Sequence, residues 1–303
     1  MTNEQAQGFL RDIKSIKFLE NEPMARHTTL KVGGPARFFI LPCDENEVLT
    51  VLRAAETYAV PVLPLGRGSN VLVADQGYNG AVLCMGEDLS AITVKDDLIE
   101  ATAGASLGAF SVSAAEANLS GLEFAGGIPG SIGGGVLMNA GAFGSDISSC
   151  VITVRCADRQ GRVREYSRDE MKFAYRQSRA MQEGLIVLST AFRLQKGNKE
   201  KIYAQMKEYA VARREKQPLN YPSAGSFFKR PEGHFAGALI EQAGLKGYAV
   251  GGAKVSEKHA GFLINTGDAT ADDFLKLKDE VQKRVLLHFG VRLEPEVRII
   301  SAQ

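Results

Sequence analysis

Residues 126–135 read GGIPGSIGGG, a stretch in which six of ten residues are glycine and two are isoleucine. Glycine lacks a Cβ, so its backbone can pass close to a flat or charged group, and consecutive bare N–H groups form a concave anion trap. A second segment of this kind, GRGSN at 66–70, lies between the apolar runs 62–65 and 71–74. Two such segments suggest one large diphosphate ligand held from two sides. Tight turns and close packing are the alternative explanation for each.

The overall composition is that of a globular protein with balanced charge. The chain has 303 residues, 45% of them hydrophobic, which predicts two or three domains. A net charge of +1 gives no electrostatic argument for nucleic acid or membrane binding. No apolar run is long enough for a membrane span, and residues 2–17 lack the apolar centre of a secretion signal. We therefore expect a cytoplasmic protein without membrane insertion.

Cysteine and histidine are used sparingly. No C-x-x-C pair occurs, so we expect reduced, buried thiols at Cys43, Cys84, Cys150 and Cys156. The four histidines show no ligand spacing, and no metal site is predicted. His288, near a helix end, is interpreted as structural because a cation there suits the helix dipole.

Helix and strand signals alternate irregularly along the chain. Helices are predicted at 1–17, after an N-cap at Asp44, and at 107–118, 200–216, 237–243 and 271–289. Strands are predicted at 36–41, 62–65, 71–74, 81–84, 91–94, 99–103, 151–157, 162–166, 186–194, 261–264 and 296–300. Without the steady βα order of a doubly wound sheet, the pattern favours an α+β fold in three parts, 1–86, 87–197 and 198–303.

Three polar residues outside the glycine segments are candidates for chemistry. Arg176, in FAYRQSR, can fork onto a carboxylate or phosphate, or lie in a solvated turn. Ser226 follows Gly225 in an apolar and basic loop and could donate a proton, or simply be a hydrogen-bonded loop serine. Glu296 stands at the start of the last predicted strand, where carboxylates are usually solvated. The fingerprints G-x-G-x-x-G, G-K-[ST] and G-x-S-x-G are absent, which argues against Rossmann, NTPase and hydrolase functions.

Taken together, these segments resemble the UDP-N-acetylenolpyruvoylglucosamine reductase family. The resemblance covers residues 23–300 and rests on LGRGSNVLV (65–73), GGIPGSIGG (126–134), YRQS (175–178), RREKQP (213–218), GSFFK (225–229) and EPE (294–296). It implies an FAD- and NADPH-dependent enzyme of peptidoglycan precursor synthesis. The implied fold is of the vanillyl-alcohol-oxidase/PCMH type, with two FAD-binding α+β subdomains and a substrate domain whose last strand returns toward the flavin. The first glycine loop contains no histidine, so FAD is expected to be non-covalent. The short segment 237–262 resembles the shorter branch of the family.

The resemblance also implies roles for individual residues. Arg176 would stabilise charge on the substrate carboxylate, Ser226 would donate a proton to the enolate-like carbon, and Glu296 would either hydrogen bond as a neutral acid or orient Arg176. The cofactor would contact Gly66, Arg67, Gly68, Ser69, Asn70, Gly104, Gly126, Gly127, Ile128, Pro129, Gly130, Ser131, Gly133, Gly134, Asn139 and Gly141. The substrate would contact Tyr175, Arg213, Lys216, Lys229, Arg230 and His259. The implied partners are UDP-N-acetylglucosamine enolpyruvate and NADPH, bound by a monomer without nucleic acid.

Two other functions remain open at this point. One is a flavoprotein of the same scaffold that oxidises an alcohol or a 2-hydroxy acid. The other is a non-enzymatic binder of flavin or nucleotide sugar, against which the set of Arg176, Ser226 and Glu296 argues, because a binder needs no proton donor.

Overall fold

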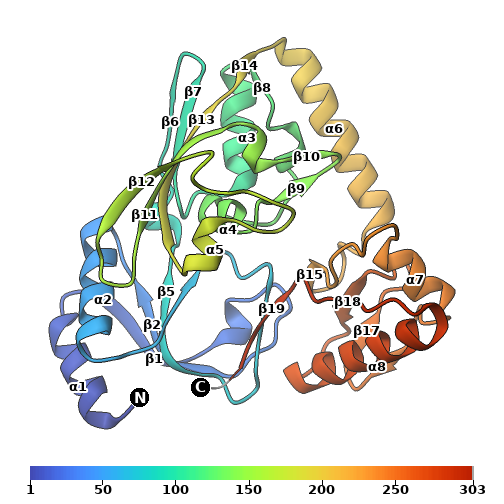
Figure 1. The fold of residues 1–303 in the computed structure, drawn as a ribbon, viewed down its shortest axis with the longest axis horizontal. Coiled ribbons are helices and arrows are strands. Elements are labelled where there is room, and N and C mark those ends of the chain that lie inside the picture. The colour runs from blue at the N-terminus through green and yellow to red at the C-terminus, as the bar shows by residue number, and fades with distance from the viewer. Residues whose placement is uncertain (302–303) are drawn as a thin grey trace. The chain divides into compact units, whose positions relative to one another are not determined.

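The computed structural model of the chain describes residues 1–301 and divides into two compact units. Unit 1 contains residues 1–20, 38–67 and 80–212. Unit 2 contains residues 21–37 and 68–79 and everything described from Arg213 onward. The predicted division into three parts, with a boundary near residue 86, stays a prediction. Figure 1 labels the elements of both units.

The N-terminal part of unit 1 is built on a sheet with strand order β1-β2-β5-β3. Its strands are β1 (Lys17–Pro23), β2 (Pro35–Leu41), β3 (Val62–Leu65) and β5 (Tyr78–Cys84), with β1, β2 and β5 running across the division between the units. Helices α1 (Asn3–Asp12) and α2 (Glu45–Thr57) pack together and share a core with this sheet. Asp44 caps α2, as predicted, by accepting a hydrogen bond from the backbone of Glu47 at 2.8 Å.

The predicted helix at 1–17 is too long. Helix α1 ends at Asp12, and Lys17 already begins β1. Both Ile13 and Ile16 are buried, so the apolar spacing continues through the turn and hides the end of the helix from a periodicity argument.

The rest of unit 1 is an antiparallel sheet with strand order β12-β11-β13-β7-β6. The strands are β6 (Ile92–Lys95), β7 (Leu98–Thr102), β11 (Val151–Ala157), β12 (Val163–Ser167) and β13 (Ile186–Arg193). Helices α3 (Leu107–Glu116) and α4 (Ile132–Leu137) pack against it around Phe110 and Phe192, whose ring centroids are 4.7 Å apart. The second glycine segment, residues 126–135, leads into α4 and therefore lies beside this sheet.

Shorter elements complete unit 1. They are β8 (Leu119–Ser120), β9 (Gly141–Ala142), β10 (Ser145–Asp146), β14 (Gln195–Lys196), α5 (Arg179–Glu183) and the 3₁₀ turns Glu87–Leu89, Glu123–Ala125 and Ile147–Ser149. Helix α6 (Lys199–Lys216) begins in unit 1 and ends in unit 2.

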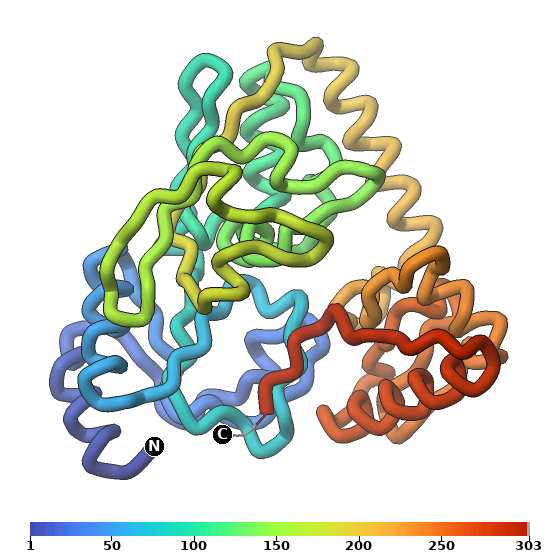
Figure 2. Tube along the Cα trace, viewed as in Figure 1, coloured from blue at the N-terminus to red at the C-terminus, as the bar shows by residue number. Residues whose placement is uncertain are grey.

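Unit 2 contains a small antiparallel sheet and its covering helices. Its strands β15 (Ser223–Ser226), β16 (Ala249–Val250), β17 (Ala253–Val255) and β18 (Phe262–Asn265) have the order β15-β18-β17-β16. Helices α7 (Ala236–Gln242) and α8 (Ala271–Phe289) close a core that includes Phe227 and Phe274. The 3₁₀ turn Met24–Arg26 also lies here. As the red trace of Figure 2 shows, the chain after α8 ends in β19 (Arg298–Ile300), which pairs in parallel with β4 (Val71–Val73).

Helix α8 is stabilised at both ends. Thr270 forms a capping box with Asp273, and the carboxylate of Asp75 accepts from the amides of Ala271 and Asp272 at 2.8 and 2.9 Å. At the other end Gly290 adopts φ 68°, and His288 lies in the last turn, as predicted.

All four cysteines are free thiols. Cys150 and Cys156 are buried, as predicted, and Cys84 is half-buried, but Cys43 is exposed, so the prediction is wrong there. Cys43 directly precedes the N-cap of α2, at the surface end of that helix. In the described part of the chain no helix is both long and apolar enough to cross a membrane.

Candidate active site and its relatives

The start of the first glycine segment meets the second segment inside unit 1, as the sequence predicted. A Cβ added to Gly66 would lie 2.2 Å from Ser131 Oγ, well inside van der Waals contact. Gly66 also lines a hollow together with Ser131, Gly133 and Gly134. Folding therefore brings residues separated by more than sixty positions against one another, and a side chain at position 66 would have to displace the Ser131 hydroxyl.

This hollow is small and mostly apolar. Its volume is about 50 Å³, so it accommodates the edge of a bound group rather than a whole cofactor. The remaining lining residues are Pro64, Leu65, Met85, Leu137, Leu185, Ile186 and Val187. From the sequence, 62–65 and 186–194 were predicted as strands, and of these lining residues only Leu65 stood in a family motif. Their position beside the glycines follows from sheet order, which no local pattern reveals.

The first glycine loop offers a row of available donors. Among residues 1–301, the amide N–H groups of the five positions 66–70 make no hydrogen bond. Gly68 holds φ 61°, and a Cβ there would lie 1.9 Å from the carbonyl oxygen of His27. Unbonded, closely spaced amides are suited to an anionic diphosphate. The loop therefore fits the diphosphate of FAD.

Other predicted cofactor glycines are explained by packing instead. The amide of Gly104 donates to Leu89 O at 2.9 Å, and a Cβ there would lie 2.0 Å from Gly86 O. Gly133 likewise donates to Ala103 O and would bring a Cβ within 2.9 Å of the Ala103 side chain. For these two positions the close-packing explanation is sufficient, and cofactor contact stays a prediction. Gly126, Gly127 and Pro129 are exposed, Ile128 and Gly130 partly so.

Arg176 is held by backbone carbonyls in unit 1. Its backbone has φ 55°, and its guanidinium donates to Asn139 O at 3.4 Å and Gly141 O at 3.3 Å. The guanidinium also lies over the exposed ring of Tyr175, 5.0 Å from the centroid. The carbonyls fix the direction of a permanently charged fork.

Asn139 connects this arginine loop to the neighbouring chain. It is 3% exposed, its Nδ2 donates to Ala174 O at 3.1 Å, and its Oδ1 accepts from the Ser148 amide at 3.1 Å. Both ends of the side-chain amide are thus used within the protein. Gly141, also a predicted cofactor contact, supplies a carbonyl to Arg176.

Ser226 and Glu296 lie on hydrogen-bonded segments of unit 2. The carbonyl of Phe227 accepts from the Glu296 amide at 2.8 Å, and Phe228 forms a bridge with Pro295. Gly225 adopts φ 75°, with nothing within 4 Å of an added Cβ. Glycine is therefore favoured there for its backbone angle. The register shift between Ser223 and Ser226 lies at the end of β15, where Ser226 is exposed.

The side chain of Asn70 reaches the same segment, because its Nδ2 donates to Glu296 O at 3.1 Å and its carbonyl accepts from Arg298.

The other predicted substrate residues of unit 2 range from exposed side chains to partly buried ones. Lys229 pairs with Glu294 at 3.3 Å, and Arg230 lies 4.5 Å over the Phe235 ring. Burial lowers the pKa of Arg213. Burial is also the main cause of a lowered pKa at His259, whose Nδ1 accepts from the Gly261 amide at 3.1 Å. Lys216 is exposed at the end of α6.

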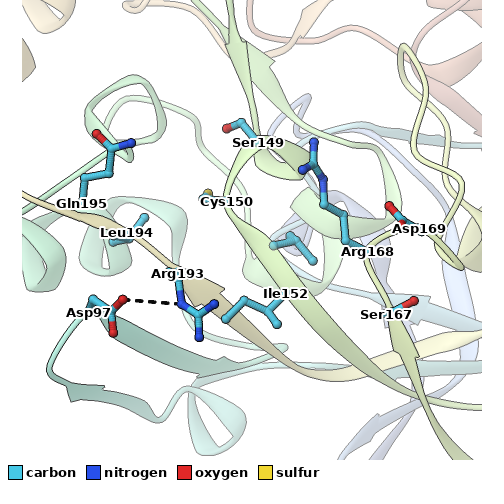
Figure 3. Close-up of a pocket in the computed structure, with 11 residues that line it drawn as sticks. Asp97, Ser149, Cys150, Ile152, Ser167, Arg168, Asp169, Arg193, Leu194 and Gln195 are labelled. Atoms are coloured by element: carbon cyan, nitrogen blue, oxygen red, sulfur yellow. Dashed lines mark ion pairs between the residues drawn. The ribbon is translucent and has the colours of Figure 1, made fainter.

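A second hollow in unit 1 contains none of the predicted site residues. It has a volume of about 680 Å³ and lies beside the start of β11 and the end of β13. Figure 3 shows Arg168 and the ion pair of Arg193 with Asp97 along it. This hollow is therefore separate from the glycine segments.

The α+β scaffold with its paired glycine segments defines an FAD-binding flavoprotein, and residues 36–167 match a family model described as "FAD binding domain". Residues 217–300 match "UDP-N-acetylenolpyruvoylglucosamine reductase, C-terminal domain". The chain belongs to the UDP-N-acetylenolpyruvoylglucosamine reductase family. This confirms the predicted family and fold class.

Curated relatives named UDP-N-acetylenolpyruvoylglucosamine reductase match nearly the whole chain. The reductase of Lachnoclostridium phytofermentans is 46% identical over 300 residues, covering 96% of this chain and 97% of its own. That of Agathobacter rectalis is 47% identical over 313 residues, with 99% of both chains covered. The crystal structure of the Thermus caldophilus enzyme has a TM-score of 0.80 at 34% identity, covering 94% of this chain and 98% of its own.

A more distant structure shows the fold alone. Glucooligosaccharide oxidase from Acremonium strictum has a TM-score of 0.50 at 12% identity, with 95% of this chain and 60% of that one covered.

Proposed function

We propose that this chain reduces the enolpyruvyl group of UDP-N-acetylglucosamine enolpyruvate to give UDP-N-acetylmuramate, with NADPH as reductant and FAD as cofactor, in peptidoglycan precursor synthesis. One observation carries this proposal: relatives named as this reductase match the chain over nearly its whole length, at 46% identity in the case of Lachnoclostridium phytofermentans. The FAD-binding and reductase-specific regions are both present in one chain.

The first glycine loop is suited to hold FAD without a covalent bond. The loop at 66–70 contains neither histidine nor cysteine, and its unbonded amides can donate to the diphosphate. Bound FAD supplies the redox chemistry, namely hydride taken from NADPH and passed to the terminal carbon of the enolpyruvyl group.

Arg176 is assigned the stabilisation of negative charge on the substrate, and Ser226 the donation of a proton. Hydride addition builds negative charge toward the substrate carboxylate, and a fixed guanidinium lowers the energy of that charge. The carbonyls of Asn139 and Gly141 give Arg176 a fixed direction before substrate arrives. Ser226, exposed beside the bulge in β15, is assigned the proton donation to the enolate-like carbon.

Two roles fit Glu296. As a neutral acid it would donate a hydrogen bond to the substrate carboxylate, and as a carboxylate it would orient Arg176. Glu296→Gln separates them, because the amide can still donate but carries no charge. Retained activity supports the neutral acid, and a large loss supports the carboxylate.

The nucleotide part of the substrate requires cations. Lys216, Lys229 and Arg230 are assigned to the diphosphate, with Tyr175, Arg213 and His259 as further contacts. Lys229 already pairs with an exposed carboxylate, Glu294, an interaction worth about 0–1 kcal/mol. Exchanging it for a diphosphate therefore costs little.

A stopped-flow experiment in two halves tests the proposal. The flavin absorbance of the wild-type protein should bleach with NADPH and recover when UDP-N-acetylglucosamine enolpyruvate is added. Ser226→Ala should bleach normally and recover about 10²–10⁴-fold more slowly, the usual contribution of a general acid. Ser223→Ala, at the other end of the same strand, is the matched control. A colourless protein that takes up no FAD, or equal slowing of both halves in Ser226→Ala, contradicts these assignments.

We also propose a cytoplasmic monomer. The cytoplasmic location is supported by the consumption of NADPH in the proposed reaction. Sedimentation of the flavin-loaded protein at several concentrations tests the monomer, and a concentration-dependent dimer would contradict it.

A further inference from the structure

Helix α6 is attached to unit 1 by a narrow stripe of side chains. The helix is strongly charged, and Ile202 is its only buried residue among those described. Met206 and Tyr209 follow at helical spacing on the same side, with Met206 Sδ 4.0 Å from Ser111 Oγ and Tyr209 packed against the core of the unit. The last contact of this stripe is thus an aromatic ring.

That ring stacks on the tip of the β9–β10 hairpin. The rings of Tyr209 and Phe143 are parallel within 8°, with centroids 4.1 Å apart. Phe143 and Gly144 form the two-residue turn between the strands, with φ 53° and 83°. Positive φ at both positions is the geometry of a type I′ turn, which favours asparagine or glycine first. Phenylalanine is conformationally unfavourable at this position. We therefore attribute its presence to the contact of its ring rather than to the turn.

The base of the same hairpin holds Arg176. Gly141 begins β9, and its carbonyl accepts from Arg176 Nη2 at 3.3 Å. The carbonyl of Asn139, two residues earlier, accepts from Nη1 at 3.4 Å. The side chain of Asn139 also ties the residues after β10 to Ala174 in the arginine loop. The tip of the hairpin thus lies beside α6 (Figure 1), and its base supplies a carbonyl to the Arg176 guanidinium.

We propose that Phe143 and Tyr209 are positioning residues for Arg176. Their stack fixes the hairpin tip on α6, and the hairpin then presents its carbonyls to the guanidinium at a fixed place. This inference rests on the proposed function, in which Arg176 stabilises charge on the substrate carboxylate. Neither aromatic ring takes part in the chemistry.

The expected effect is confined to one half of the reaction. If the hairpin tip is released, the guanidinium is no longer held where negative charge develops, and a misplacement of about 1 Å can cost about 10²-fold in rate. The unbonded amides at 66–70 lie on a different segment and are unaffected. FAD binding and NADPH-driven bleaching should therefore change by less than about twofold.

Phe143→Gly is the principal variant, because glycine removes the ring and is compatible with the positive φ of the turn. Tyr209→Ala removes the other ring, whereas Phe143→Tyr and Tyr209→Phe keep the stack. Tyr203→Ala is the matched control: Tyr203 is an exposed tyrosine on the same helix, and no ring contact of it is found in the described residues.

The measurement is stopped-flow recovery of flavin absorbance with UDP-N-acetylglucosamine enolpyruvate, using flavin-loaded protein. Phe143→Gly and Tyr209→Ala should each slow recovery about 10–100-fold, with the double variant no slower than either single one. Phe143→Tyr, Tyr209→Phe and Tyr203→Ala should retain the wild-type rate.

Wild-type recovery in Phe143→Gly and Tyr209→Ala, or equal slowing of bleaching and recovery, would overturn the inference. If the wild-type flavin bleaches but is not reoxidised by this substrate, the proposed function itself fails, and the inference with it.

Discussion

The contact between Gly66 and Ser131 can be tested by placing a methyl group in it. In Gly66→Ala the new Cβ would lie 2.2 Å from Ser131 Oγ, far closer than ordinary van der Waals contact. Ser131 is 2% exposed, so its hydroxyl can escape only by giving up its cap of the Gly134 amide. Losing such a cap costs about 1 kcal/mol, and overpacking a buried site adds about 1–3 kcal/mol. We expect Gly66→Ala to lower the free energy of unfolding by about 2–4 kcal/mol.

A second substitution shows whether that cost arises at this contact. Ser131→Ala alone should cost about 1 kcal/mol through the lost cap. In Gly66→Ala/Ser131→Ala the clashing oxygen is gone and the next atom, Ser131 Cβ, is 3.3 Å away. The double variant should therefore be no less stable than Gly66→Ala. That corresponds to a coupling energy of at least about 1 kcal/mol, above the roughly 0.3–0.5 kcal/mol within which independent sites add.

The assay is equilibrium urea unfolding of the flavin-free protein, followed by circular dichroism. Gly134→Ala is the matched control, because its Cβ would lie 3.6 Å from the same Ser131 oxygen, and alanine is favoured over glycine within a helix. It should be neutral or stabilising. Additive costs for Gly66→Ala and Ser131→Ala would refute the contact between the two glycine segments and the flavin site built on it.

Three further outcomes are expected. Asp75→Ala should destabilise unit 2 by about 1–2 kcal/mol in urea unfolding, because α8 loses two charge-assisted bonds to its first amides; Asp75→Asn, which keeps an acceptor, should lose less, and equal losses would contradict this account. Because burial lowers the pKa of His259, the unfolded chain takes up the proton first. The contribution of His259 is therefore complete above its unfolded pKa of about 6.5 and is lost as pH falls below it; unfolding at pH 7.5 and 5.5 should show a smaller pH difference in His259→Gln. A thiol reagent should label exposed Cys43 first, since burial raises the pKa of Cys150 and Cys156 to about 12, and early labelling of the buried pair would argue against their burial.

Elements with strong local signals could be predicted from the sequence. Helix α8 and strand β11 have the bounds that the pattern predicted, and the N-cap at Asp44 is observed. These succeed because capping groups and apolar spacing act within a few residues of the element. The strand β1 was missed because most of its side chains are exposed and give no apolar pattern. It is held by pairing with the neighbouring strand β2. The same applies to the short strand β16, neither of whose residues is buried.

For the candidate site, the sequence by itself determined the family and supplied the candidate residues. The sequence shows, in order along the chain, two glycine-rich loops, the candidate cation Arg176, Ser226 after a glycine, and the carboxylate Glu296. Only the tertiary structure decided which of them meet. It placed Gly66 against Ser131, joined Glu296 to the backbone of Phe227, and gave Gly104 a packing contact rather than an evident ligand contact. The physical reason is the separation along the chain over which each kind of interaction acts. Backbone angles and caps act between near neighbours in the chain, whereas these contacts form only after sheets and helices have fixed the path of the chain between them.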